Sequence, residues 1–204
     1  MENIQSKLYF PSQVVSGDIE NFAAQGHKLV DWIYDYRDRN PRSANISNEG
    51  GWQSYDKWFY ETEPSFEPWM DLFKQELREL LEYYRFEYQN IDLTAMWINI
   101  SSKNCYNVTH THKPTHLSGV WWIKIPKNSG RFIFTYPDGS YSDISLINNT
   151  QMDYREEIWL HPGITEYPRE GKIMLFPSSM PHRVELNQSD EDRISISFNL
   201  MINT

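Results

Sequence analysis

The chain has 204 residues, of which 23% are charged and 39% are hydrophobic, and its formal net charge is −9. This composition excludes a disordered or fibrous chain, and a domain of this length can bury a substantial core. The negative charge does not favour nucleic-acid partners, and no apolar run is long enough to span a membrane. A single cysteine, Cys105, cannot form an internal disulfide, so we expect a cytoplasmic protein.

The first part of the chain carries helical periodicity. A short extended segment at residues 7–15 leads to a helix expected at about 19–39, which Ser16 or Asp18 could cap. A second helix is expected at about 65–88, because large apolar residues recur there at helical spacing. Both helices should turn an apolar stripe towards a common core.

The segment between the two helices, residues 40–56, is rich in Gly, Asn and Ser around a single tryptophan. This composition predicts a long loop. We expect the part formed by Gly50, Gly51, Trp52 and Gln53 to cover a substrate, with the two glycines permitting closure.

From Asp92 onward the pattern changes to short apolar runs separated by turn residues. The expected strands are residues 93–101, 106–112, 118–125, 131–136, 141–146, 156–160, 172–176, 182–187 and 193–202. Helices followed by many short strands predict a mainly β protein, a jelly-roll barrel with two helices packed on one face. We expect one domain over residues 1–204, with helical support at about 16–90 and the barrel at about 92–202.

Three histidines form the sharpest chemical signal. His110 and His112 are two residues apart in a strand-like run, so both side chains should leave the same face, and His182 follows a later apolar run. Neutral imidazoles suit Fe(II), Zn(II), Cu(II) and Ni(II), and three ligands leave positions open for other groups. The alternative is that the histidines face solvent. His116 is a competing ligand, but it lies beyond Pro114 and would need a sharp turn.

Arg193 opens the alternating run R-I-S-I-S-F-N. Alternation predicts one polar face, made of Arg193, Ser195, Ser197 and Asn199. A guanidinium can bind a carboxylate through two hydrogen bonds, so a dicarboxylic molecule would fit beside the metal. The alternative is an arginine at a sheet edge, paired with Asp190 or Asp192.

Asn99 lies on a predicted strand that precedes the histidine pair. A neighbouring strand of the barrel could bring its amide to the edge of the metal site. An inward polar group that is satisfied by backbone hydrogen bonds is an equally good interpretation.

Two close ligands, one distant ligand and then an arginine is the order found in oxygenases that hold Fe(II) in a β-barrel and bind 2-oxoglutarate. Four sequence blocks carry this likeness: N-E-G-G-W-Q-S, H-T-H-x-x-x-x-x-S-G-V-W-W-I, G-K-I-M-L-F-P-S-S-M-P-H and R-I-S-I-S-F-N. Over residues 8–200 the chain resembles the family of 2-oxoglutarate/Fe(II)-dependent oxygenases found in bacteria and their viruses.

The resemblance implies a double-stranded β-helix fold, bound Fe(II), and 2-oxoglutarate oxidised to succinate and CO₂ with consumption of O₂. It places metal ligation on His110 and His182, and cosubstrate binding on Arg193 with Ser195 in support. His112 stands where prolyl-hydroxylase-like relatives carry a carboxylate ligand. We therefore expect His110, His112 and His182 to hold iron, with Arg193, Ser195 and Asn99 around the cosubstrate, in a hydroxylase of an unidentified small molecule, peptide or protein.

Two other functions remain open from the sequence. A cupin-type dioxygenase with three histidine ligands would not need 2-oxoglutarate, and Arg193 would then bind the substrate's carboxylate. A non-catalytic barrel would bind a ligand or partner with a metal that is structural or absent. A strict requirement for 2-oxoglutarate separates the first from the hydroxylase, and ligand binding by metal-free protein would favour the second.

Overall fold

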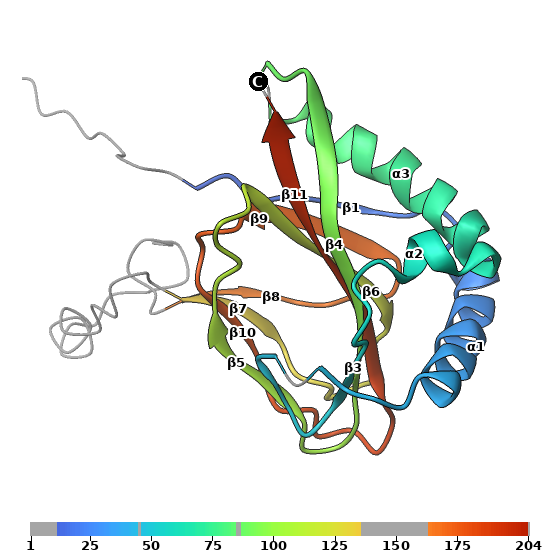
Figure 1. Ribbon diagram of the computed structural model, residues 1–204. Coiled ribbons are helices and arrows are strands. Elements are labelled where there is room, and N and C mark those ends of the chain that lie inside the picture. The colour runs from blue at the N-terminus through green and yellow to red at the C-terminus, as the bar shows by residue number, and fades with distance from the viewer. Residues whose placement is uncertain (1–11, 45, 85–86, 136–162, 204) are drawn as a thin grey trace, which may run out of the picture.

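The protein is described by a computed structural model over residues 12–44, 46–84, 87–135 and 163–203. Two antiparallel sheets face each other, and the helices cover the outer side of the larger sheet (Figure 1). The helical elements are α1 (Ala23–Arg39), α2 (Phe59–Thr62), the 3₁₀ turn η1 (Pro64–Phe66) and α3 (Glu67–Glu82). None of the helices in these ranges is long and apolar enough to cross a membrane.

The larger sheet has six strands in the order β1-β9-β6-β11-β4-β3, and the smaller has five in the order β2-β5-β10-β7-β8. The strands are β1 (Val15–Asp18), β2 (Asn48–Glu49), β3 (Trp52–Gln53), β4 (Asn90–Ser101), β5 (Tyr106–His110), β6 (Leu117–Lys124), β7 (Phe132–Thr135), β8 (Gly163–Glu166), β9 (Lys172–Pro177), β10 (His182–Val184) and β11 (Arg193–Asn203). This is the mainly β, double-stranded β-helix architecture that was expected.

Strand β11 shows how alternation divides the interior. Ile194, Ile196 and Phe198 are fully buried and pack with the apolar residues of the helices. Arg193 and the serines at alternate positions instead line a hollow between the two sheets. The predicted division of this strand into an apolar and a polar face is confirmed.

The first helix begins later than predicted. Residues 15–18 pair with β9 as strand β1, and the backbone of Ile19 donates to Gly171 O at 3.0 Å. Neither Ser16 nor Asp18 caps α1, whose N-cap is Phe22 without a side-chain hydrogen bond. The prediction failed because the ladder with β9 satisfies this backbone in the extended form.

The second predicted helix is shorter than expected and starts with a 3₁₀ turn. η1 and α3 stand in place of the single helix expected at 65–88, α3 ends at Glu82, and α2 is an additional short helix before the predicted start. Pro64 begins the 3₁₀ turn, and Pro68 lies in the first turn of α3. A proline is compatible with a helix start but not with a helix interior, which explains the division.

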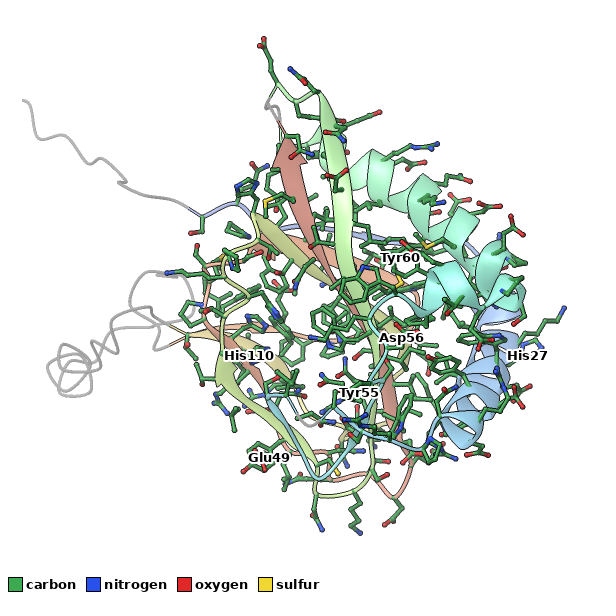
Figure 2. The ribbon with its side chains drawn as sticks, in the orientation of Figure 1. His27, Glu49, Tyr55, Asp56, Tyr60 and His110 are labelled. Carbon is green, nitrogen blue, oxygen red and sulfur yellow. The ribbon has the colours of Figure 1, made fainter. Side chains whose placement is uncertain are left out.

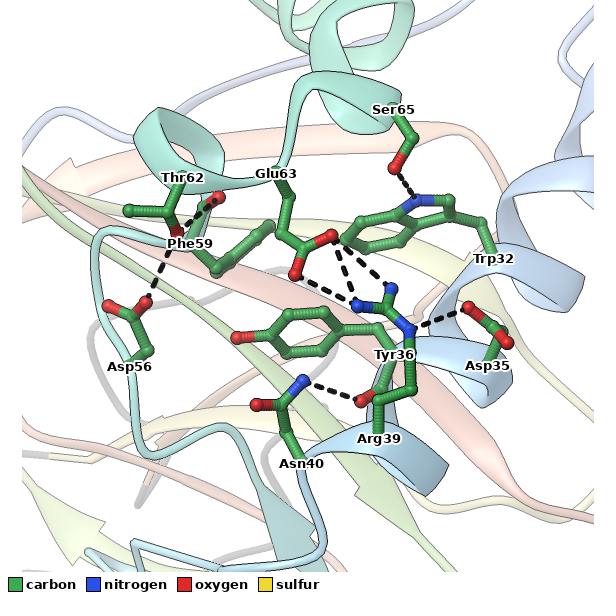
Figure 3. A network of polar contacts seen from close by, with 10 residues as sticks. All are labelled: Trp32, Asp35, Tyr36, Arg39, Asn40, Asp56, Phe59, Thr62, Glu63 and Ser65. Carbon is green, nitrogen blue, oxygen red and sulfur yellow. Dashed lines mark hydrogen bonds and ion pairs between the residues drawn. The ribbon is translucent and has the colours of Figure 1, made fainter.

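Figure 3 shows how the end of α1 is joined to α2 and η1. The Arg39 guanidinium lies between Asp35 and Glu63, 2.9 and 3.0 Å from their carboxylate oxygens. Beside these ion pairs, Trp32 donates its indole N–H to Ser65 Oγ and stacks on Tyr36. The helical elements are therefore joined to one another by side-chain contacts, in addition to packing on the sheet.

The segment at residues 40–56 is paired at two points rather than being an irregular loop. β2 pairs with β5 of the smaller sheet, and β3 pairs with β4 of the larger sheet. Figure 2 shows Glu49 beside β5 and Asp56 near α2, so the segment crosses from one sheet towards the helices. A Cβ on Gly51 would lie 2.7 Å from Ile100 O, so this glycine permits a close backbone approach. The prediction of a long loop is therefore wrong for residues 48–49 and 52–53, which are strands.

Most other predicted strands are present with shifted ends. β5 ends at His110 rather than at 112, and β10 ends at Val184 rather than at 187. The strands predicted at 141–146 and 156–160 lie outside the described residues. The short strands β1, β2, β3 and β8 were not among the predicted strands, and β2 and β3 contain only two residues each.

Candidate metal centre

His110, His112 and His182 meet between the two sheets. His110 on β5 and His182 on β10 are directly opposite each other in the antiparallel ladder. His112 follows two residues after His110, beyond the end of β5. One ring nitrogen of each histidine lies within 4.8 Å of the corresponding atoms of the other two. Figure 2 labels His110 on its strand.

Two of the rings are held by backbone carbonyls on their own chain segments. His110 Nδ1 donates to Val108 O at 2.8 Å, and His182 Nδ1 donates to Met180 O at 2.9 Å. A carbonyl oxygen can only accept, so Nδ1 carries the proton and Nε2 keeps its lone pair. Metal-bound histidines usually have such a partner on the other ring nitrogen.

The nitrogen atoms of His112 and His182 have a spacing suited to a shared ion. Their Nε2 atoms are 3.2 Å apart. Two nitrogens about 2.1 Å from one ion would be about 3.0 Å apart at a right angle and about 3.4 Å apart at the tetrahedral angle. The observed distance lies between these limits, so one ion can accept both lone pairs.

The environment of His182 is buried and largely aromatic, whereas His110 and His112 are partly buried. His182 is 3% exposed, stacks on Phe132 with ring centroids 5.0 Å apart, and meets the Phe176 ring edge-on at 4.8 Å. Burial, with a smaller contribution from His110, lowers the pKa of His182 to about 3. Burial, with smaller effects of the other two histidines and Lys57, also lowers the pKa of His112 to about 3. The imidazoles are therefore neutral at pH 7, and a metal would displace no proton from them.

His116 does not join this group. Its Nδ1 accepts a hydrogen bond from the backbone N–H of Ile202 in β11 at 3.0 Å. This ring nitrogen is therefore already engaged. The structure therefore brings together the three histidines that were predicted to converge, and leaves their competitor outside.

Arg193 lies in the wall of the same hollow as the histidines. Its side chain is 4% exposed, and Nη1 donates to the backbone oxygens of Ser129 and Glu185. Its Nη2 is buried and has no hydrogen-bond partner among the described residues. Burial lowers the pKa of Arg193 to about 10, so the guanidinium keeps its charge at neutral pH.

The alternative of an edge arginine paired with a neighbouring aspartate is wrong. Asp190 accepts from Lys103 at 2.6 Å, and Asp192 accepts from the Tyr34 hydroxyl at 3.0 Å. Arg193 instead points inward, where an unpaired cationic donor costs free energy unless a ligand or water satisfies it.

Asn99 also lines the hollow, but side chains bind its amide. Asn99 Oδ1 accepts from Gln53 Nε2 at 3.0 Å, and Asn99 Nδ2 donates to Ser197 Oγ at 3.1 Å. The interpretation that backbone groups satisfy Asn99 is therefore wrong, because a chain of side-chain hydrogen bonds satisfies it. That chain ties β3 to the strand that carries Arg193.

Several lining residues were not singled out from the sequence. Trp97 packs against His112 with ring centroids 5.4 Å apart, and Ser101 lies further along the same strand. Ser47 Oγ lies 3.4 Å from His110 Nε2. Trp97, Asn99 and Ser101 occupy every second position of β4 and face the hollow together. The period of the strand could therefore have identified Trp97 and Ser101 once Asn99 was assigned an inward direction.

Among the described lining residues, the hollow carries only positive charge. Arg193 is the only charged side chain, and no carboxylate is present. A larger surface hollow of about 660 Å³ lies around Arg131, Arg183 and Glu185 and contains none of the three histidines. The three histidines therefore line the inner hollow and not the larger one.

The comparisons with known proteins agree with this geometry. Residues 95–199 match the family model described as "Putative 2OG-Fe(II) oxygenase". None of the curated proteins matches the chain. Three solved structures share the fold at low sequence identity.

The carbocyclase SnoK from nogalamycin biosynthesis, non-heme and alpha-ketoglutarate-dependent, has a TM-score of 0.67 at 9% identity, covering 94% of this chain and 80% of SnoK. The viral collagen prolyl hydroxylase of Paramecium bursaria Chlorella virus-1, solved with 2-oxoglutarate, has a TM-score of 0.57 at 12% identity. The match covers 93% of this chain and 97% of the hydroxylase. HygX from Streptomyces hygroscopicus, solved with nickel and 2-oxoglutarate, has a TM-score of 0.56 at 11% identity. The match covers 93% of this chain and 82% of HygX.

Proposed function

The chain belongs to the family of 2-oxoglutarate/Fe(II) oxygenases, as the motif resemblance predicted, and we propose that it hydroxylates an organic substrate. Fe(II) and 2-oxoglutarate are its cofactors. Together they supply the oxidising chemistry, in which one O₂ is consumed, 2-oxoglutarate becomes succinate and CO₂, and a C–H bond of the substrate becomes C–OH. We assign metal binding to His110, His112 and His182.

The observation that carries this proposal is the unpaired Nη2 of Arg193 in the same hollow as the three histidines. Neutral imidazole nitrogens suit Fe(II), and three protein ligands leave positions for a cosubstrate and O₂. A dicarboxylate bound to the iron through its keto-acid end would have its second carboxylate free for a buried cationic donor. The residues present therefore fit both cofactors.

Arg193 has the geometry of a fixed anchor. Because Nη1 is engaged by two backbone carbonyls, the guanidinium is oriented before any ligand arrives. Ser195 lies on the same face of β11 and lines the same hollow, so its hydroxyl can add a second hydrogen bond. We assign both residues to the distal carboxylate of 2-oxoglutarate.

Asn99 is our candidate contact for the carboxylate next to the keto group. Its Nδ2 now donates to Ser197 Oγ, so this role requires the amide to exchange one partner for another. The rings of Phe132 and Phe176, which contact His182, keep water from the inner side of the site. Exclusion of water strengthens the charge interaction that Arg193 makes.

The test is succinate formation against 2-oxoglutarate concentration for the wild type, Arg193→Ala and Arg193→Lys. Losing one side of a buried, charge-assisted contact costs on the order of 2–5 kcal/mol. The apparent KM of Arg193→Ala should therefore rise by roughly 30-fold to several-thousand-fold, at about 1.4 kcal/mol per decade. Arg193→Lys should recover only part of the loss, because an ammonium cannot grip two oxygens in one plane.

Two controls make this result specific. Mn(II) affinity should be unchanged in Arg193→Ala, since the arginine is not a ligand. Arg169→Ala is the control variant, because Arg169 is an exposed arginine that pairs with Asp18 and does not line the hollow, so it should leave the KM unchanged. If the wild type couples turnover tightly, binding of N-oxalylglycine to the Mn(II) form replaces succinate as the measurement. A KM and an affinity that Arg193→Ala does not alter would show that the cosubstrate is anchored elsewhere.

Family membership also bears on the two other functions that the sequence left open. The family consists of oxygenases that use 2-oxoglutarate, which argues against a barrel that only binds a ligand. The absence of a carboxylate among the described lining residues is the feature shared with three-histidine dioxygenases. Oxygen consumption that continues unchanged without 2-oxoglutarate would favour that class.

A further inference from the structure

His112 differs from the other two histidines in how the fold places it. His110 and His182 are fixed by pairing between β5 and β10, but His112 lies beyond the end of β5. Its backbone is instead held on both sides. His112 N–H donates to Ser178 O at 2.9 Å, and His112 O accepts from Thr115 N–H at 3.2 Å and from Thr115 Oγ1 at 2.7 Å.

A chain of side chains continues from this point into the larger sheet. Thr115 Oγ1 lies 2.9 Å from Ser178 Oγ, and Ser178 Oγ lies 2.7 Å from Ser118 Oγ. Ser118 Oγ lies 2.8 Å from Asn199 Oδ1, and these two residues are direct partners in the pairing of β6 with β11. The path from His112 therefore ends in the centre of the larger sheet.

The chain of contacts is buried and saturated. Ser178 is 0% exposed and Ser118 is 1% exposed. The hydroxyls of Thr115, Ser178 and Ser118 supply three protons for four contacts, so every proton is used in the chain. Losing one hydroxyl would remove one contact from each of its neighbours in a place that water cannot easily enter to replace it.

We propose that Thr115, Ser178, Ser118 and Asn199 are positioning residues that hold His112 on the metal, and we call them the hydroxyl network. The proposal rests on the proposed function, because the network acts only through His112. Two imidazoles of the centre then come from pairing within the smaller sheet, and the third is fixed to the larger sheet. The network is what joins the two sheets at the metal.

The test uses Thr115→Val, which removes the hydroxyl at nearly constant volume, and Ser178→Ala. Co(II) is titrated into each full-length variant and followed by its visible absorption. Loss of a residue that orients a ligand typically costs 10–100-fold in metal affinity. We expect both variants to bind Co(II) roughly 10–100-fold more weakly than the wild type. Their Co(II) spectra should approach the spectrum of His112→Ala. Thr115→Ser keeps the hydroxyl and should restore wild-type affinity and spectrum.

Ser54→Ala is the matched control. Ser54 is also 0% exposed, and its hydroxyl accepts from Ile98 N–H and donates to Asp56 O, away from the histidines. It should lower the melting temperature about as much as Ser178→Ala without changing Co(II) affinity. Wild-type affinity and spectrum in Thr115→Val would overturn the hydroxyl network, as would an equal loss of affinity in Ser54→Ala. Failure of the wild type itself to bind Co(II) would count against the proposed function instead.

Discussion

His112 occupies the place that a carboxylate fills in the usual iron site of two histidines and one carboxylate. The fold does not reserve that place by strand pairing, because His112 stands in the turn after β5. Its ring is fixed by Trp97 on one side and by the short approach to His182 on the other. A different donor at the same position could therefore still reach the ion.

We expect His112→Asp to keep metal binding and His112→Ala to weaken it severely. The aspartate supplies an oxygen donor and adds a negative charge that attracts the cation, whereas alanine leaves only two protein ligands. Anaerobic Fe(II) titration of the three proteins measures this order, and circular dichroism controls for the fold. Complete loss of iron from a folded His112→Asp protein would show that the pocket accepts only the longer imidazole.

At the scale of elements, the segment that was predicted to be a lid carries β2 and β3, which pair with strands of both sheets. Asn48, Gln53 and Ser54 are all at most 3% exposed. The backbone N–H of Ser54 donates to Ile98 O at 2.9 Å, and the Val108 N–H donates to Ser47 O at 3.0 Å. Such groups exchange slowly because they open only when the pairing is broken.

We therefore expect the Ser54 and Val108 amides to be protected from hydrogen exchange in the metal-free protein, at the level of central strands such as β6. Residue-resolved exchange with and without Mn(II) and N-oxalylglycine measures this. Rapid exchange of both amides that becomes slow only with ligand would contradict this and support the predicted lid. The exposed Tyr55, at the end of the segment, serves as an internal reference for fast exchange.

The features that the sequence predicted are those whose signals lie within one strand or between strands with strong apolar patterns. The alternation after Arg193 is local, so it predicted which side chains of β11 face the hollow. The convergence of His110 and His112 was predicted on the same ground, but β5 ends at His110 and other contacts place His112. The pairing of β2 and β3 could not be predicted, because two-residue strands have no period and depend on distant partners. The contact between Thr115 and Ser178 joins residues that are 63 positions apart, and only the packed sheets bring them together.

At the scale of the whole molecule, the chain is strongly acidic while its inner hollow is cationic. The net charge is −9, yet Arg193 is the only charged residue among the described lining residues, and burial keeps the imidazoles neutral. A bound divalent ion would raise the positive charge of the hollow further. The exterior and the interior therefore act on a small dianion with opposite sign.

This opposition has a consequence for the rate of encounter. A doubly negative cosubstrate is repelled at long range by the surface and attracted only when it reaches the mouth of the hollow. Added salt screens the long-range part first, since the Debye length falls from about 30 Å at 0.01 M to about 10 Å at 0.1 M. Stopped-flow association of N-oxalylglycine with the Mn(II) protein should therefore accelerate over this range, in a salt with a weakly coordinating anion. The dissociation rate should change little, because the contacts that hold the ligand are buried.

Association that slows with salt would mean that the field of the hollow extends past the acidic surface and steers its ligand. If it accelerates, this protein captures its cosubstrate best in solutions of moderate ionic strength, and dilute buffer would understate its speed.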